Sequence, residues 1–111
     1  MLFLAELTDL AYTAVVQPTA ERHIVIWGAG RIGRGFVADL FDRAGYRLIL
    51  IDQAPELITE LRRAGRYTLV YASGHGHLSR RVLTGFTALA TTETDAVAAA
   101  VVQADLLALA V

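Results

Sequence analysis

The 111-residue sequence contains no cysteine and no lysine. Without cysteine the chain has no disulfide, no thiol nucleophile and no thiolate ligand for zinc. All ten basic side chains are arginines, so no catalytic step that needs a lysine can take place within this chain. The formal net charge is only −1, and such a balance gives no general attraction to nucleic acid or to an anionic membrane.

Long apolar runs are missing as well, since no segment reaches the ~18 uninterrupted apolar residues of a membrane span. The first ten residues are apolar but include Glu6 and Asp9, and the first cation is Arg22, whereas a signal peptide begins with positive charge. We therefore expect a cytoplasmic protein that binds neither membrane nor nucleic acid. Hydrophobic residues make up 55% and charged residues 19%, which indicates one folded domain rather than a disordered chain.

The N-terminal segment has helical periodicity. Residues 3–16 place four apolar side chains on one helical stripe, and Pro18 would end such a helix. The stripe consists of Leu4, Leu7, Ala11 and Val15. We therefore predict an N-terminal helical extension over residues 1–20 that packs against a domain formed by residues 21–111.

The first half of that domain alternates between strands and helices. Residues 23–27 and 46–51 are short apolar runs that predict buried strands, and the spacing of residues 31–44 and 55–64 predicts helices. This order predicts a parallel sheet with right-handed crossover connections and helices on both faces. Four apolar side chains of the first helix are expected to share one face: Ile32, Phe36, Leu40 and Phe41.

The second half contains a hairpin and a final strand. Residues 67–71 and 77–84 flank a glycine-rich turn, which predicts a β-hairpin inserted into the α/β pattern. A short strand at 86–90, a helix at 93–103 and a buried strand at 106–111 follow. In the usual strand order 3-2-1-4 the last strand lies at an edge, so the sheet is expected to be incomplete at the C-terminus. Self-association is expected there unless the N-terminal helix covers the edge.

A glycine motif carries the chemistry. Gly28, Gly30 and Gly33 form a G-x-G-x-x-G after the first predicted strand and at the start of a helix, and Asp52 ends the second strand. This context is that of the dinucleotide-binding fingerprint. The first glycine permits a tight turn, the second lets a pyrophosphate approach the backbone, and the third brings the helix close to the strand. The helix N-terminus then presents free N–H groups to the phosphates.

The predicted cofactor is NAD rather than NADP. Asp52 can accept hydrogen bonds from ribose hydroxyls, whereas a 2′-phosphate would face its carboxylate, and the next three residues carry no cation. Arg31 and Arg34 can reach the pyrophosphate, and a solvated helix face explains them equally well. The complete set of predicted cofactor-binding residues is Gly28, Ala29, Gly30, Arg31, Ile32, Gly33, Arg34 and Asp52.

Two other features admit a functional interpretation. His75 and His77 lie on the hairpin turn, but no carboxylate or cysteine is near them in sequence, so we predict no metal site. Trp27 directly precedes the glycine loop, and we expect it in the core, with a wall of the adenine pocket as the alternative.

The segment IWGAGRIGRGF (26–36) resembles the N-terminal signature of mannitol-1-phosphate 5-dehydrogenases, among the long-chain polyol dehydrogenases. The resemblance extends through DRAGYRLILID (42–52) and the hairpin to the end of the chain. It implies a Rossmann domain that binds NAD in the oxidation of a polyol phosphate. It also implies that the catalytic residues, including a lysine, belong to a later helical domain, so this chain alone is expected to bind the cofactor without catalysis.

Two rival interpretations remain at this stage. Rossmann modules that sense nucleotides and gate potassium transport share the glycine loop and the acidic residue. They usually continue into a Gly-Asp-Ala-type segment, which this chain lacks, and they do not insert a hairpin. A degenerate copy that binds NAD and catalyses nothing is the second rival.

Overall fold

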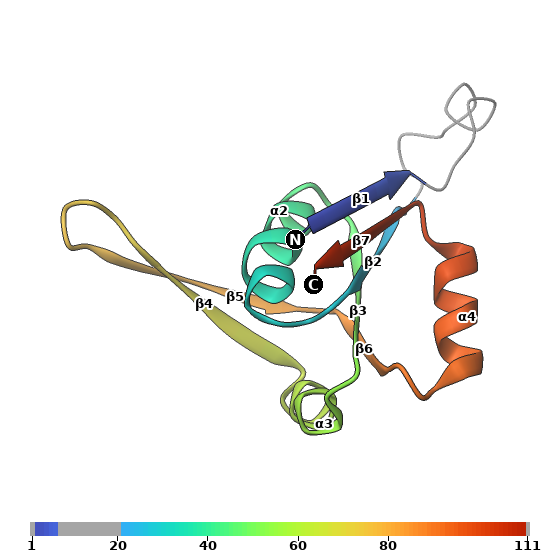
Figure 1. The fold of residues 1–111 in the computed structure, drawn as a ribbon. Coiled ribbons are helices and arrows are strands. Elements are labelled where there is room, and N and C mark those ends of the chain that lie inside the picture. Colours follow the sequence, from blue (N-terminus) through green and yellow to red (C-terminus); the bar gives the residue numbers. More distant parts are fainter. Residues whose placement is uncertain (1, 7–20, 111) are drawn as a thin grey trace.

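A single five-stranded sheet organises the molecule (Figure 1). The structure is a computed structural model and describes residues 2–6 and 21–110. The strand order is β1-β7-β2-β3-β6. These strands are β1 (Leu2–Glu6), β2 (His23–Trp27), β3 (Arg47–Asp52), β6 (Thr87–Ala90) and β7 (Leu106–Ala110).

Four of these strands are parallel and confirm the α/β prediction. β2 pairs with β3 on one side and β7 on the other, and β6 pairs with β3. In chain order the four parallel strands therefore lie 3-2-1-4, as the sequence predicts. Their carboxyl ends lie at one edge of the sheet, the edge at which open α/β sheets bind ligands.

The N-terminal segment differs from the prediction. Leu2–Glu6 is the strand β1, which runs antiparallel to β7 over its full length, from Leu2 opposite Ala110 to Glu6 opposite Leu106. The predicted helix is therefore wrong for residues 3–6, and its remainder lies outside the described residues. The physical reason is the free edge of β7, whose backbone groups gain hydrogen bonds from an added strand. The edge strand expected to promote self-association is thus paired within the chain.

Helices cover both faces of the sheet, as predicted. One face is packed by η1 (Arg31–Val37), a wide π-helical segment that continues directly into α2 (Ala38–Arg43), and by α3 (Pro55–Ala64). The other face is packed by α4 (Thr94–Gln103). Alternate side chains of β2 point to opposite faces of the sheet and so enter different cores: Ile24 and Ile26 belong to the core on the first face, and Val25 belongs to the core under α4.

The first helix turns a different face to the sheet from the one its apolar spacing indicates. Gly33, Val37 and Ala38 are buried, and Phe41 packs beside them. The other members of the predicted apolar face are not in the core, since Ile32, Phe36 and Leu40 are 50%, 62% and 51% exposed. The prediction that these three share a face with Phe41 is therefore wrong.

The predicted hairpin is present as a separate two-stranded sheet, β4 (Arg66–Ala72) and β5 (Leu78–Thr84). It projects from the body beside α2, as the long arm at the left of Figure 1. Its base is anchored by Leu83, which is buried, and by the Tyr67 ring against Phe86 at 5.4 Å between centroids. Across the described parts of the chain, no helix is long and apolar enough to cross a membrane.

Candidate functional site

A pocket of about 330 Å³ lies at the carboxyl ends of the parallel strands. Its walls come from the ends of β2, β3 and β7 and from the residue after β6. The lining residues are Trp27, Gly28, Asp52, Gln53, Thr91 and Ala110. Trp27, half-buried, both lines this pocket and packs against the core under α4. The topology therefore gathers the glycine loop and Asp52, distant in sequence, at one crevice.

Gly28 makes the turn out of β2. Its φ of +101° lies in the left-handed region, and its N–H donates to the Ile51 carbonyl at 2.7 Å. A Cβ atom here would lie closer than 3.0 Å to the Ala110 carbonyl oxygen of β7. Both the conformation and the neighbouring strand therefore require glycine.

Gly33 lets the helix approach the strand. An added Cβ would lie within 3.0 Å of the Gly28 carbonyl oxygen and 3.3 Å from Cγ2 of Ile26. The backbone of η1 thus sits directly on the turn it leaves, which fixes the face of the helix that meets the sheet. This is the packing role that the fingerprint assigns to its third glycine.

Gly30 has no such structural reason to be glycine. Its backbone is ordinary, with φ −77°, and no atom lies within 4 Å of the position that its Cβ would take. The space beside this backbone is open, at the start of a helix whose first N–H groups have no partner within the helix. Such a position fits a pyrophosphate that approaches the main chain, because a side chain would fill the space that the ligand needs.

Asp52 is held in place by two backbone hydrogen bonds. Its Oδ2 accepts from the Ala29 N–H and its Oδ1 accepts from the Ala54 N–H, both at 2.8 Å. An ionised carboxylate offers about four acceptor positions, so about two remain for a ligand. The Thr91 N–H donates to the Asp52 carbonyl at 3.1 Å and closes the next side of the pocket. Asp52 therefore both shapes the glycine loop and faces the pocket with unused acceptor capacity.

The remaining predicted residues of the loop are dispersed. Ala29 is fully buried, and its contribution is the N–H that binds Asp52. Arg34 follows the loop, and its Nε is buried without a hydrogen-bond partner in the described structure. Arg31 instead lines a groove beside the hairpin, and the exposed side chain of Ile32 lies outside both cores. The structure thus brings Gly28 and Asp52 into one pocket and directs Arg31 elsewhere.

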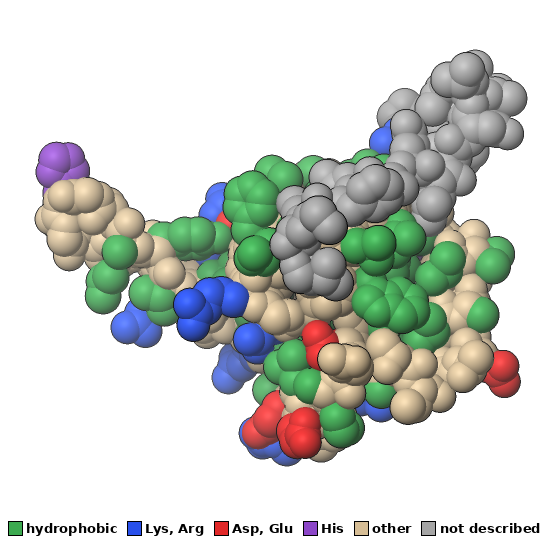
Figure 2. Space-filling model, viewed as in Figure 1, with side chains coloured by type: hydrophobic (Ala, Val, Ile, Leu, Met, Phe, Trp, Pro, Cys, Tyr) green, Lys and Arg blue, Asp and Glu red, His purple; other side chains and the backbone are tan. Residues whose placement is uncertain are grey.

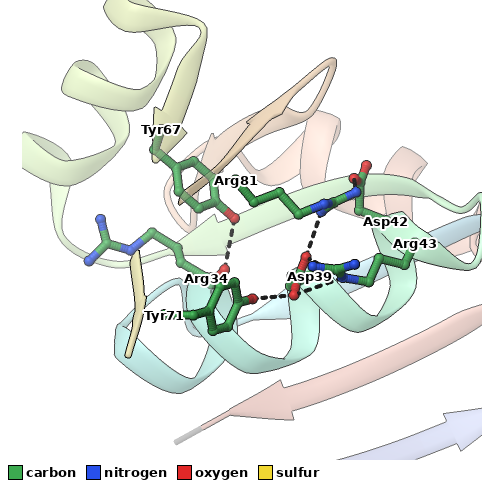
Figure 3. A network of polar contacts seen from close by, with 7 residues as sticks. All are labelled: Arg34, Asp39, Asp42, Arg43, Tyr67, Tyr71 and Arg81. Carbon is green, nitrogen blue, oxygen red and sulfur yellow. Dashed lines mark hydrogen bonds and ion pairs between the residues drawn. The ribbon is translucent and has the colours of Figure 1, made fainter. Parts of the chain in front are cut away.

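Sequence reasoning missed a polar cluster that joins the hairpin to α2 (Figure 3). Asp39, largely buried on α2, accepts hydrogen bonds from Arg43 and Tyr71 and pairs with Arg81 at 2.5 Å. Arg81 also pairs with Asp42 at 2.6 Å. We call these five residues the Asp39 cluster. Only the Asp39–Arg43 pair, four residues apart on one helix, left a signal in the sequence.

Contacts within the Asp39 cluster shift the pKa values of Asp39 and Tyr71. Burial raises the pKa of Asp39, but the hydrogen bonds from Tyr71 and Arg43 and the charges of Arg43 and Arg81 outweigh burial and leave the pKa lowered. The hydrogen bond to Asp39 in turn raises the pKa of Tyr71. These effects indicate a charged carboxylate that ties the hairpin to the helix at neutral pH.

A second hydrogen bond between the hairpin and the first helix lies beside the Asp39 cluster. The Tyr67 hydroxyl donates to the Arg34 carbonyl at 2.9 Å, and burial raises the pKa of Tyr67 well above its usual range. The hairpin is thereby attached to the helix that carries the glycine loop.

The histidines lie away from the pocket. His23 begins β2, at the opposite end of that strand from Gly28, and His75 and His77 lie at the hairpin turn. Within residues 2–6 and 21–110, no group of three or more His, Asp or Glu side chains is arranged to hold a metal. The polar side chains that line the strand-end pocket are the Asp52 carboxylate, the Gln53 amide and the Thr91 hydroxyl.

Comparison with known proteins agrees with this geometry. The family model described as "Mannitol dehydrogenase Rossmann domain" matches residues 22–111. The chain is 47% identical over 76 residues to a mannitol-1-phosphate 5-dehydrogenase of Arthrobacter sp., an alignment that covers 67% of this chain and 19% of the relative. It is 38% identical over 89 residues to the enzyme of the same name from Oceanobacillus iheyensis, which covers 78% of this chain and 22% of the relative.

The matched region is a small part of these relatives. The enzyme of the same name from Brevibacillus brevis is 37% identical over 87 residues, again 78% of this chain and 22% of the relative. The chain therefore spans about a fifth of the length of the curated relatives it matches. The family match covers the whole parallel sheet, the glycine loop and the hairpin. The chain therefore belongs to the mannitol dehydrogenase Rossmann domain family.

Proposed function

We propose that residues 21–111 bind NAD as the cofactor domain of an oxidoreductase that acts on a polyol phosphate, of the mannitol-1-phosphate 5-dehydrogenase type. A Rossmann domain from a dehydrogenase family implies a nucleotide cofactor. The observation that carries the proposal is the pocket at the strand ends, which Gly28 and Asp52 line and where Asp52 keeps unused acceptor capacity. Gly30, two residues after Gly28, adds open space beside the backbone at the start of the helix. The polyol phosphate as substrate rests on the names of the relatives.

The proposed contacts follow from the glycine roles. The pyrophosphate would lie against the backbone from Gly30 to Gly33, and the Arg34 guanidinium would supply a charge-assisted contact. The ribose hydroxyls nearest the adenine would donate to Asp52. Trp27 and Thr91 border the space beyond Asp52 and would flank the adenosine.

The same carboxylate favours NAD over NADP. The 2′-phosphate of NADP would lie against the Asp52 carboxylate, and two negative charges in contact repel each other in a partly buried site. The residues that follow, Gln53 and Ala54, provide no cation to compensate. When bound, NAD would accept a hydride from the carbon of the substrate that is oxidised; this chain's own residues bind and orient the cofactor.

Catalysis is proposed to require polypeptide beyond the matched region, because this chain spans about a fifth of its relatives and carries no lysine for the family's catalytic position. Residues 1–20 are proposed as an extension, of which Leu2–Glu6 completes the sheet. A nucleotide-sensing module of the potassium-transport type is not favoured, because the family match includes the inserted hairpin.

Calorimetric titration with NAD tests the proposal. The wild-type chain is expected to bind NAD weakly, since the nicotinamide half of the site is proposed to lie partly outside this chain. Gly30→Val is expected to abolish binding without unfolding, because nothing surrounds that position and the new side chain takes the place of the pyrophosphate. Gly74→Val, on the hairpin turn and equally open, is the matched control and should bind as wild type. Undiminished binding by Gly30→Val would refute the proposed site.

A further inference from the structure

A second concave surface lies between the first helix and the hairpin, away from the strand-end pocket. It is a groove of about 520 Å³ with one wall from η1 and α2 and the other from β4. Its lining residues are Arg31, Gly35, Phe36, Asp39, Leu40, Arg43, Leu69, Val70 and Tyr71. We call it the hairpin groove.

The walls of the hairpin groove are apolar and exposed. Phe36 and Leu40 project from the helix with more than half of their surface exposed, and Val70 faces them from the hairpin at 54%. Figure 2 shows hydrophobic side chains along the projecting hairpin, with cationic side chains among them. An exposed patch of this kind, contiguous and concave, marks an interaction site more often than a single exposed apolar residue does.

Gly35 gives independent support. It lies within η1 and lines the groove, yet no atom lies within 4 Å of the position of its missing Cβ, and its φ is not in the left-handed region. Glycine inside a helix costs roughly 1 kcal/mol relative to alanine. No contact within the described structure requires glycine at this position. The open space beside Gly35 is therefore suited to close approach by another polypeptide chain.

The charges at the groove identify the chemistry of the occupant. Arg31 and Arg43 border the apolar walls, and Arg31 makes no ion pair with any described residue. Asp39, the one acidic residue in the lining, already binds Arg43, Arg81 and Tyr71. A second copy of this chain would bring arginines against arginines if the two grooves faced each other, so the rim favours a partner that carries carboxylates.

We propose that the hairpin groove binds an amphipathic helix that packs its apolar face on Phe36, Leu40 and Val70 and sets carboxylates against Arg31 and Arg43. Insertion of one apolar helix face between two walls is an established mode of recognition, read as anchors at i, i+3, i+4 and i+7. About four-fifths of the length of the curated relatives lies outside the region that matches this chain, which leaves ample polypeptide for such a helix in proteins of this family.

The test uses a synthetic 18-residue peptide with leucines at i, i+3, i+4 and i+7 and glutamates on both flanks. Its matched control is the same peptide with lysine in place of each glutamate. Amide chemical shifts of the labelled chain report binding residue by residue. The glutamate peptide is expected to produce saturable shifts over residues 31–43 and 69–71, and to bind at least tenfold more tightly than the lysine peptide.

Two variants and one control locate the contact. Phe36→Glu should weaken binding of the glutamate peptide at least tenfold, by removing an anchor and adding a like charge. Gly35→Leu should weaken it as well, by filling the open space beside that position, and it serves if Phe36→Glu fails to fold. Val102→Glu is the control, because Val102 is an 85% exposed apolar residue of α4, on the other face of the sheet. Thermal unfolding followed by circular dichroism checks that each variant is folded.

Three results would overturn the proposal. The first is equal affinity for the two peptides or no binding of either. The second is binding that folded Phe36→Glu and Gly35→Leu both retain. The third is a dimer in sedimentation experiments that Phe36→Glu dissociates, since the groove would then bind a second copy. All three readouts are independent of NAD, so their failure is separable from failure of the proposed cofactor site.

Discussion

The three motif glycines should respond differently to the same substitution, and Gly33→Ala against Gly30→Ala is the sharpest comparison. The new methyl group at Gly33 would lie closer than 3.0 Å to the Gly28 carbonyl oxygen, and Gly28 is itself fixed between β3 and β7. Neither backbone can yield without disturbing the sheet. Forcing a methyl into a packed site costs about 1–3 kcal/mol, and replacing a helical glycine by alanine returns about 1 kcal/mol.

With the clash at the upper end of that range, Gly33→Ala should lower the free energy of unfolding by about 2 kcal/mol. At roughly 4–8 °C per kcal/mol for a domain of this size, the melting temperature should fall by about 8–16 °C. Gly30→Ala meets no atom within 4 Å and has an ordinary φ, so its melting temperature should stay the same or rise slightly. Only its affinity for NAD should fall.

Thermal unfolding by circular dichroism and NAD titration of both variants form the assay. Gly28→Ala, which combines a left-handed φ with a close contact to Ala110, is expected to be at least as destabilised as Gly33→Ala. A wild-type melting temperature for Gly33→Ala would refute the close helix–strand contact. A large loss of stability in Gly30→Ala would show that Gly30 has a structural role and that the space beside it is not open for a ligand.

Other predictions concern the hairpin, the sheet edge and activity. Asp39→Asn should increase hydrogen exchange across residues 66–84 while the central sheet stays protected, because the Asp39 cluster attaches the hairpin; unchanged exchange would contradict that role. Since the pKa of Asp39 is lowered in the folded chain, its stabilisation is present above the ordinary value of 3.8 and is lost as pH falls through the lower folded value. Hairpin exchange in the wild type should therefore rise in acid, and a flat profile would exclude this linkage. Deleting residues 1–6 should expose β7 and produce concentration-dependent association in sedimentation velocity, whereas a monomer at high concentration would show that β1 is not needed to cover the edge. The chain alone should form no NADH from mannitol 1-phosphate, and sustained turnover would show that it contains the catalytic groups.

The glycine loop could be predicted because its physics is local. Gly28 must make a turn and Gly33 must touch a strand only a few residues away, so the motif and the two flanking apolar runs carry the information. The parallel sheet followed from the right-handed crossover connections, and the strand order followed from the usual order of such sheets. Asp52 was placed correctly at the end of its strand, but its hydrogen bonds to the backbone of Ala29 and Ala54 depend on how the two loops meet, which spacing does not report.

The failures involve contacts that hydrophobic periodicity does not report, and two of them join segments distant in sequence. Residues 3–6 have helical periodicity, yet the free edge of β7, a hundred residues later, offers them backbone hydrogen bonds. Phe36 and Leu40 lie on an apolar stripe that locally resembles a core face, but the contact between Gly33 and Gly28 decides which side of the helix meets the sheet. The pairing of Arg81 with Asp39 joins a hairpin to a helix and has no counterpart in local sequence.

The central claim is that Asp52 and the glycine loop bind NAD, and a paired calorimetric titration with NAD and NADP tests it most directly. Hydrogen bonds to a charged group are worth roughly 1.5–3 kcal/mol, so the wild-type chain should bind NAD at least about tenfold more tightly than NADP. Asp52→Asn keeps an acceptor oxygen but removes the charge, and it should narrow that difference by weakening NAD binding and relieving the repulsion of the 2′-phosphate. Equal affinities for NAD and NADP in the wild-type chain, unchanged in Asp52→Asn, would contradict the account.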